Sequence, residues 1–235
     1  MFVSLHSNQN QNQNKMNKRL LIICCMLYMA LLGFAAQTAS PNGLISLTPK
    51  GNGYVISYQK QPVLEVSALG YEGMKQEQLL FTPSGKINSD YIMLSGKKRH
   101  CTNEATEYRA NLDKGVTLVV RLYDDGVAFR YEFPRQRGLQ DFVIMDEVTQ
   151  FALATDAQAW SIPALTPYYE GIYTREPVSR KGNMSGPVAL EVNDTLCMAI
   201  MEANLTDYST MNLSHDGTVL KVDLVPWQNG DKVRV

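Results

Sequence analysis

The stretch VTLVVRLYDDGVAFRYEF, residues Val116–Phe133, decides the fold class. Two β-branched and aromatic runs, Val116–Tyr123 and Val127–Phe133, are separated by Asp124-Asp125-Gly126, and an Asp-Gly pair is a strong signal for a tight turn. Within the second run, side-chain character alternates as it does in a strand with one buried face. Val127, Phe129, Tyr131 and Phe133 fall on the predicted core face, and Ala128, Arg130 and Glu132 fall on the other. The stretch therefore predicts an antiparallel β-hairpin.

The chain beyond residue 36 has the same strand-like character. No long window carries the i, i+3, i+4, i+7 spacing of an amphipathic helix, and turn residues recur at short intervals. Further strands are expected at residues 54–58, 62–66, 142–145, 149–153, 188–192, 196–201 and 219–225, the first two as a hairpin. We therefore predict an all-β fold, built as an antiparallel sandwich.

Composition excludes several classes of protein. The chain has 235 residues, of which 45% are hydrophobic and 19% charged, which is typical of a globular protein rather than a disordered one. Its formal net charge of -1 provides no basic field for nucleic acid. Four cysteines are too few for a disulfide-built fold, and three histidines argue against a multi-histidine metal centre.

The N-terminus has the organisation of a secretory signal peptide. A Gln/Asn-rich tract, residues 1–15, precedes the basic stretch Met16–Arg19 and the apolar run Leu20–Phe34, after which small residues offer a cleavage site. The run is shorter than the ~20 apolar residues that a membrane span needs. We therefore predict an unstructured leader and signal peptide at residues 1–36, no stable membrane span, a mature domain at residues 37–235, and export to the periplasm or the medium.

The four cysteines raise two further questions. Cys24 and Cys25 lie within the apolar run, where they suggest a lipid anchor, but Ile23 precedes Cys24 and lipid-modified cysteines usually follow a small residue. The signal peptide is therefore the preferred interpretation. Cys101 and Cys197 remain in the mature chain, and they are either a pair in an oxidising compartment or two buried free thiols.

Signatures of the common catalytic machineries are missing from the sequence. It contains no Gly-x-Gly-x-x-Gly loop, no Walker lysine, no Cys-x-x-Cys pair and no Gly-x-Ser-x-Gly elbow. His100 and His215 lie in polar segments without an adjacent nucleophile, which favours solvated loop histidines. Asp124 and Asp125 belong to the predicted turn, where acids serve backbone geometry. We therefore assign no catalytic residue, and substrate-binding residues stay unknown.

Three segments remain unusual: Tyr123–Tyr131, the aromatic stretch Trp160–Tyr173, and Met201–Tyr208, which reads MEANLTDY. Each has a structural interpretation on its own, as a hairpin with an aromatic core face, a proline-bearing aromatic loop, and a strand that ends in an Asx-rich turn. The aromatic stretch has a second interpretation, because its side chains are suited to stacking on sugar rings. The residues concerned are Trp160, Tyr168, Tyr169 and Tyr173.

Taken together and in this order, the three segments resemble the N-terminal domain of glycoside hydrolase family 97 over residues 40–235. Members of this family are exported α-glucosidases and α-galactosidases, including one of a starch-utilisation system. The resemblance implies a β-super-sandwich similar to galactose-mutarotase-like domains, here truncated before its last strands. It also implies that a catalytic (β/α)₈ barrel, which takes about 250 residues, follows the sandwich in the parent enzyme.

The resemblance further implies what the domain contributes to such an enzyme. It completes the pocket for an α-linked oligosaccharide and supplies one glutamate to a calcium ion that is shared with the barrel. Glu202 in the segment MEANLTDY matches that glutamate. Asn204 and Asp207 offer further oxygen atoms, although an Asx turn explains both. The sugar, the linkage and the stereochemical outcome stay open.

A second functional hypothesis comes from another class of protein. A stand-alone secreted β-sandwich that binds glycans or a partner protein would carry the same strands and exposed aromatic residues. The two hypotheses differ in whether a barrel domain accompanies this chain. Without the barrel, the expected state is an inactive fragment of a glycoside hydrolase, because glycoside hydrolysis needs two carboxyl groups that flank the scissile bond.

Overall fold

The computed structural model describes residues 38–134, 144–164, 170–206 and 208–225. The predicted leader and signal peptide lie outside these ranges, as do Tyr168, Tyr169 and Asp207. Within the described ranges the chain forms 15 β-strands and two short 3₁₀ turns, Asp113–Gly115 and Val178–Arg180. None of the helical turns in the described part of the chain is long and apolar enough to cross a membrane.

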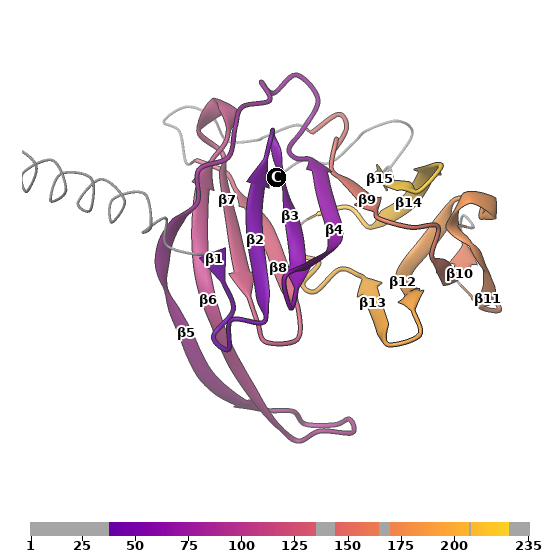
Figure 1. Ribbon diagram of the computed structural model, residues 1–235, viewed down its shortest axis with the longest axis horizontal. Coiled ribbons are helices and arrows are strands. Elements are labelled where there is room, and N and C mark those ends of the chain that lie inside the picture. Colours follow the sequence, from indigo (N-terminus) through magenta and orange to yellow (C-terminus); the bar gives the residue numbers. More distant parts are fainter. Residues whose placement is uncertain (1–37, 135–143, 165–169, 207, 226–235) are drawn as a thin grey trace, which may run out of the picture. The chain divides into compact units, whose positions relative to one another are not determined.

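A large sheet contains 11 strands, and all its pairings are antiparallel. Its first part is a meander, and strands from the second half of the chain extend it (Figure 1). The order is β1 (Thr38–Ala39), β2 (Ile45–Lys50), β3 (Gly53–Tyr58), β4 (Gln61–Ala68), β9 (Gln150–Leu153), β15 (Val219–Leu224), β14 (Met211–Asp216), β12 (Met184–Asn193), β10 (Gln158–Pro163) and β11 (Thr174–Pro177), and β13 (Leu196–Ile200) also pairs with β12.

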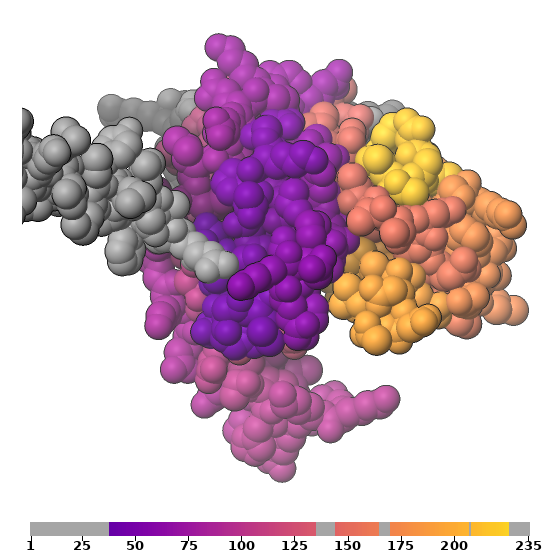
Figure 2. All heavy atoms as spheres, in the orientation of Figure 1, coloured from indigo at the N-terminus to yellow at the C-terminus, as the bar shows by residue number. Residues whose placement is uncertain are grey.

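A smaller antiparallel sheet contains four strands in sequence order: β5 (Thr82–Ile92), β6 (His100–Asn111), β7 (Thr117–Leu122) and β8 (Val127–Glu132). Its β5–β6 hairpin is long and projects from the body of the domain, as Figures 1 and 2 show.

The β7–β8 hairpin confirms the prediction from the sequence. Its strands pair from Leu122 with Val127 to Thr117 with Glu132, and the Tyr123 amide donates to the Gly126 carbonyl across the turn at 2.8 Å. The side chains predicted for the core face pack against the hydrophobic core, namely Val127, Phe129, Tyr131 and Phe133.

The two sheets pack face to face. One hydrophobic core contains side chains of β2 and β3 together with Leu118, Val120 and Leu122 of β7, and β2 and β3 lie across β7 and β8 in Figure 1. Burying each of these three β7 side chains contributes about 1.5–3 kcal/mol. The Tyr108 hydroxyl of β6 also accepts a hydrogen bond from the Ala39 amide at 3.0 Å. The predicted all-β super-sandwich is therefore confirmed.

A glycine permits the close approach of two strands. A Cβ atom on Gly53, the first residue of β3, would lie 1.8 Å from the carbonyl oxygen of Val66 in β4. No other residue fits there without moving the backbone. This explains why the predicted hairpin of β3 and β4, which the structure confirms, begins with a glycine.

Some expectations from the sequence are wrong. His100 and His215 belong to strands β6 and β14 rather than loops; His215 is half-buried, and its Nε2 contacts the Lys181 carbonyl oxygen. Cys101 and Cys197 are free thiols, but they are not buried, because Cys101 is half-exposed and Cys197 exposed. The strand expected at residues 142–145 falls partly outside the described residues, and Ile144 and Met145 belong to no strand.

Candidate functional site

Glu202, the residue expected to bind calcium, lies in the link between β13 and β14. Strand β13 ends at Ile200, two residues before Glu202, and the Glu202 side chain is exposed at the edge of the sheet. Its Oε1 accepts a hydrogen bond from the Met211 amide, the first residue of β14, at 2.9 Å. This bond fixes one carboxylate oxygen, and no hydrogen bond to the other is present among the described residues.

The surroundings of Glu202 suit a cation-binding carboxylate. Although the residue is exposed, neighbouring protein atoms keep some water from its carboxylate and thereby raise the pKa of Glu202, and the hydrogen bond from the Met211 amide only partly offsets this effect. Within the described ranges no ion pair neutralises the carboxylate. Calcium is a hard cation that prefers oxygen ligands, so the chemistry of this donor fits the ion.

Glu202 alone does not make a complete site. Calcium takes 6–8 oxygen ligands. Within the part of the chain that the structure describes, no group of three or more His, Cys, Asp or Glu side chains could hold a metal ion. The Asn204 side-chain oxygen accepts from the Thr206 hydroxyl at 3.1 Å, a local bond between side chains rather than the backbone bond of an Asx turn that was expected. Among the described residues, Glu202 can thus offer one carboxylate to a calcium ion, and the other ligands would have to come from outside these residues.

A second carboxylate, which the sequence analysis overlooked, lies buried near this link. Glu147 is only 9% exposed. Its Oε1 accepts a hydrogen bond from the Thr149 hydroxyl at 2.5 Å, and its Oε2 accepts one from the Tyr208 hydroxyl at 2.6 Å. Burial raises the pKa of Glu147, and the negative charges of Asp146 and Glu202 raise it further, while the two hydrogen bonds lower it.

The Glu147 carboxylate ends a chain of hydrogen bonds through the core. The Gly70 amide donates to the Tyr131 hydroxyl at 2.9 Å, and that hydroxyl lies 2.8 Å from the Thr149 hydroxyl. Thr149 has no solvent exposure, and its hydroxyl donates to Glu147. The only sequence signal was the spacing of Glu147 and Thr149, which places both side chains on one side of an extended segment just before β9.

The described aromatic side chains of the aromatic stretch, Trp160 of β10 and Tyr173 just before β11, differ in exposure from those of the core. Trp160 is 40% exposed and Tyr173 is 43% exposed, so packing in the core does not explain them. The Trp160 indole donates to Glu191 at 2.7 Å, and the Arg175 guanidinium donates to the same carboxylate at 2.6 Å. Hydrogen bonds from Arg175 and Trp160 lower the pKa of Glu191. Stacking on sugar remains a prediction for Trp160 and Tyr173.

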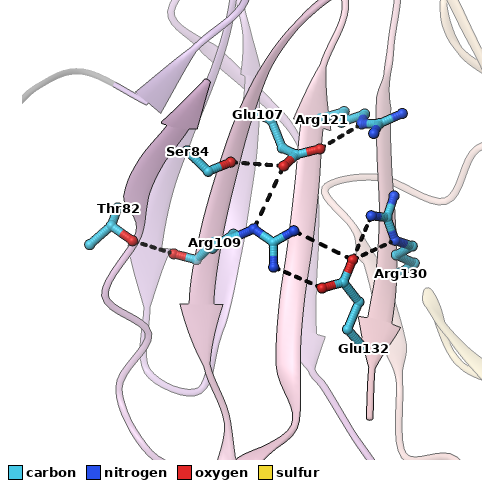
Figure 3. Close-up of polar contacts among 7 residues, drawn as sticks. All are labelled: Thr82, Ser84, Glu107, Arg109, Arg121, Arg130 and Glu132. Atoms are coloured by element: carbon cyan, nitrogen blue, oxygen red, sulfur yellow. Dashed lines mark hydrogen bonds and ion pairs between the residues drawn. The ribbon is translucent and has the colours of Figure 1, made fainter. Parts of the chain in front are cut away.

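The outer face of the small sheet carries a dense ion-pair network (Figure 3). Arg109 bridges two acids: its Nη1 lies 2.7 Å from Glu132, and its Nε lies 3.7 Å from Glu107. Arg121 and Arg130 complete the network at 2.8 Å from Glu107 and 2.5 Å from Glu132. These acids are all paired with arginines, which is the arrangement of a structural network rather than of a catalytic acid and base.

The turn acid Asp124 also has a structural role. Its carboxylate accepts a hydrogen bond from the Asn42 amide at 2.9 Å and thereby fastens the β1–β2 turn to the β7–β8 turn. The carboxylate thus binds a backbone amide, as a structural acid would, although that amide belongs to another turn and not to its own.

Comparison with known proteins places the domain in a family. Residues 38–233 match the family described as glycosyl-hydrolase 97 N-terminal. A protein of Streptomyces bingchenggensis named as a probable retaining alpha-galactosidase is 29% identical over 175 residues, which is 65% of this chain and 27% of that protein.

Solved structures agree with this match. A glycoside hydrolase family 97 enzyme of Pseudoalteromonas sp. strain K8, solved in complex with acarbose, has a TM-score of 0.75 and 27% identity, and the alignment covers 85% of this chain and 33% of that one. A beta-arabinopyranosidase at 21% identity and a TM-score of 0.73 shares the fold. The chain thus spans about a third of the length of these enzymes. Since the family model covers nearly all residues after the predicted signal peptide, the chain belongs to the glycosyl-hydrolase 97 N-terminal family.

Proposed function

We propose that this chain is the N-terminal domain of an exported α-glycosidase that acts on α-glucosides or α-galactosides, and that it completes the substrate pocket and contributes Glu202 to a calcium ion. The observation that carries the proposal is the family match over residues 38–233 together with the limited share of each relative that the chain spans. The names of the relatives, an alpha-galactosidase and an enzyme solved with acarbose, support the class of substrate.

The chemistry of the described residues supports a contributing role rather than a complete active site. Glycoside hydrolysis needs a proton donor and a nucleophile or base on opposite sides of one bond. The best-defined acid pair among the described residues, Glu107 and Glu132, is bridged by Arg109 and therefore unsuited to that task. Glu202 instead offers one oxygen at the sheet edge, where a second domain can supply the remaining ligands of the ion.

The role of the ion in such an enzyme would be electrostatic. A bound calcium ion supplies positive charge that orients oxygen atoms of the substrate and stabilises negative charge. This chain would hold the ion through Glu202, while the bond from the Met211 amide keeps that carboxylate in place. Export, which the predicted signal peptide implies, would bring the domain to the compartment where glycans are found.

Hydrolysis assays test the proposal. The purified 235-residue chain should not hydrolyse nitrophenyl α-glucoside or α-galactoside. A longer protein in which a barrel domain follows the chain should hydrolyse one of them, and a calcium chelator should lower its rate. The proposal would be contradicted if the 235-residue chain alone hydrolysed a substrate and a substitution in that chain abolished the activity. It would also be contradicted if the longer protein bound α-linked oligosaccharides without hydrolysing them.

A further inference from the structure

The link between β13 and β14, which carries Glu202, is attached to the sandwich at two points. Near its start, Glu202 bonds to the Met211 amide at 2.9 Å. Near its end, the Tyr208 hydroxyl donates to Oε2 of Glu147 at 2.6 Å. Tyr208 is half-buried and packs against the hydrophobic core. The second attachment joins residues 61 positions apart and leads directly into the interior of the domain.

Glu147, which accepts the hydrogen bond from Tyr208, is itself held in place by other contacts. The Gly70 amide donates to the Tyr131 hydroxyl, so the phenolic proton of Tyr131 is available to Thr149, and the Thr149 proton goes to Glu147. The backbone of Glu147 is also held, because it forms a β-bridge with Tyr71. The hydrogen bond from Thr149 and the β-bridge both restrain the Glu147 carboxylate, to which Tyr208 donates.

A carboxylate is a costly choice for this position. Burial disfavours its charged form, and no ion pair compensates it among the described residues. A glutamine would fill nearly the same volume without that cost. What a carboxylate adds is a second acceptor oxygen: Oε1 accepts from Thr149 and Oε2 accepts from Tyr208, whereas the NH2 group of a glutamine could accept neither bond. The Tyr208–Glu147 hydrogen bond is therefore the anchor of the link that carries Glu202.

We propose that Glu147 is a positioning residue, which holds Tyr208 and through it keeps the β13–β14 link in the orientation that presents Glu202 to a cation. The inference rests on the proposed role of Glu202 in calcium binding. Ligands of a metal site must be held within about 0.5 Å of their productive positions, and residues outside the coordination sphere do this. Glu147 acts here through one hydrogen bond and does not contact the ion.

Hydrogen exchange of the 235-residue chain tests the anchor without any metal. Tyr208→Phe removes the single hydroxyl that ties the link to Glu147. Tyr131→Phe is the matched control, because it removes the same group from the same network but leaves the Tyr208–Glu147 bond in place. We expect Tyr208→Phe to raise amide exchange rates in residues 201–211 by about tenfold, and Tyr131→Phe, which loosens Glu147 only indirectly through Thr149, to raise them much less.

A second variant covers the case in which Tyr208→Phe fails to fold, as judged by circular dichroism. Glu147→Gln keeps the shape of the side chain but replaces one acceptor oxygen with an amide donor, so exchange in residues 201–211 should rise above that of the original protein. Exchange equal to that of the original protein in every one of these variants that folds, or a rise in the Tyr131→Phe control as large as in them, would overturn the anchor.

Calorimetric titration of calcium into the longer enzyme completes the test. Tyr208→Phe should weaken calcium binding by about tenfold, whereas Tyr131→Phe should weaken it much less. If Glu202→Gln leaves calcium affinity unchanged, the calcium role of Glu202 fails, and the exchange data alone decide whether the anchor exists. If Glu202→Gln weakens calcium but Tyr208→Phe does not, the positioning role of Glu147 is wrong.

Discussion

Replacing Glu107 with glutamine should destabilise the domain by removing the best-connected acid of the small sheet. Glu107 is 8% exposed and accepts from Arg121 Nε and from the Ser84 hydroxyl, both at 2.8 Å (Figure 3). Glu107 also forms a longer ion pair, in which its Oε1 lies 3.7 Å from Arg109 Nε. Glu107→Gln keeps the size of the side chain and removes the charge that holds both guanidinium groups.

The magnitude follows from the exposure of the partners. A hydrogen bond to a charged group contributes about 1.5–3 kcal/mol. The Arg121 and Arg109 side chains are 28% and 39% exposed, so water screens the pairs and the lower end applies. We expect a loss of about 1.5 kcal/mol in the free energy of unfolding, or about 3–6 °C in melting temperature for a domain of this size.

The dependence on pH gives a second signature. Burial opposes ionisation of Glu107, but hydrogen bonds from Arg121 and Ser84 outweigh it and lower the pKa of Glu107. Because the pKa of Glu107 is lower in the folded than in the unfolded chain, its ionised form stabilises the fold fully above the unfolded pKa of about 4.3. This stabilisation is lost as the pH falls from that value through the folded pKa. The stability difference between the original protein and Glu107→Gln should therefore be largest near neutral pH and shrink in acid.

Urea unfolding followed by circular dichroism measures both effects, and Glu65→Gln is the matched control. Glu65 pairs with Lys50 at 2.7 Å, but the Lys50 side chain is 62% exposed, so this pair should contribute no more than about 0.5 kcal/mol. Equal losses in the two variants at neutral pH, or a difference that grows in acid, would refute the reasoning.

Three further predictions concern packing, export and the thiols. Gly53→Ala should cost several kcal/mol in urea unfolding because its Cβ would collide with the neighbouring strand, whereas Gly182→Ala, with open space around it, should be nearly neutral. N-terminal sequencing of exported protein should show cleavage near residues 35–36, and an intact start in a cytoplasmic product would contradict the signal peptide. Ellman's reagent should detect Cys101 and Cys197 as free thiols in the mature chain without reductant; no reaction would indicate a disulfide.

The strands that sequence predicted and those that it missed differ in how they are buried. Strand β8 alternates apolar and polar side chains because only one of its faces meets the core, so its pattern was visible. Strand β5 is exposed along nearly its whole length, and the hairpin that it forms with β6 projects into solvent. Burial imposes no alternation on β5 or on the first half of β6, so backbone pairing alone defines that part of the hairpin, and pairing leaves little trace in composition.

The residues of the candidate site also divide into one that the sequence pointed to and one that it did not. Glu202 was found because the segment that carries it resembles a family motif. Glu147 was not, because its proposed positioning role depends on Tyr208, 61 residues away, and on a buried hydrogen-bond chain that only the fold assembles. A buried carboxylate without an ion-pair partner is a signal that the structure can give and the sequence cannot.

The calcium affinity of Glu202→Gln tests the central claim most directly. In a longer protein that carries both this domain and a barrel, calcium would be titrated by calorimetry and hydrolysis measured at saturating calcium. Glu104→Gln, which changes an exposed acid of β6, is the control. The account predicts that Glu202→Gln weakens calcium binding and lowers activity together while the melting temperature of the metal-free protein is unchanged. Calcium affinity and rate equal to those of Glu104→Gln would contradict it.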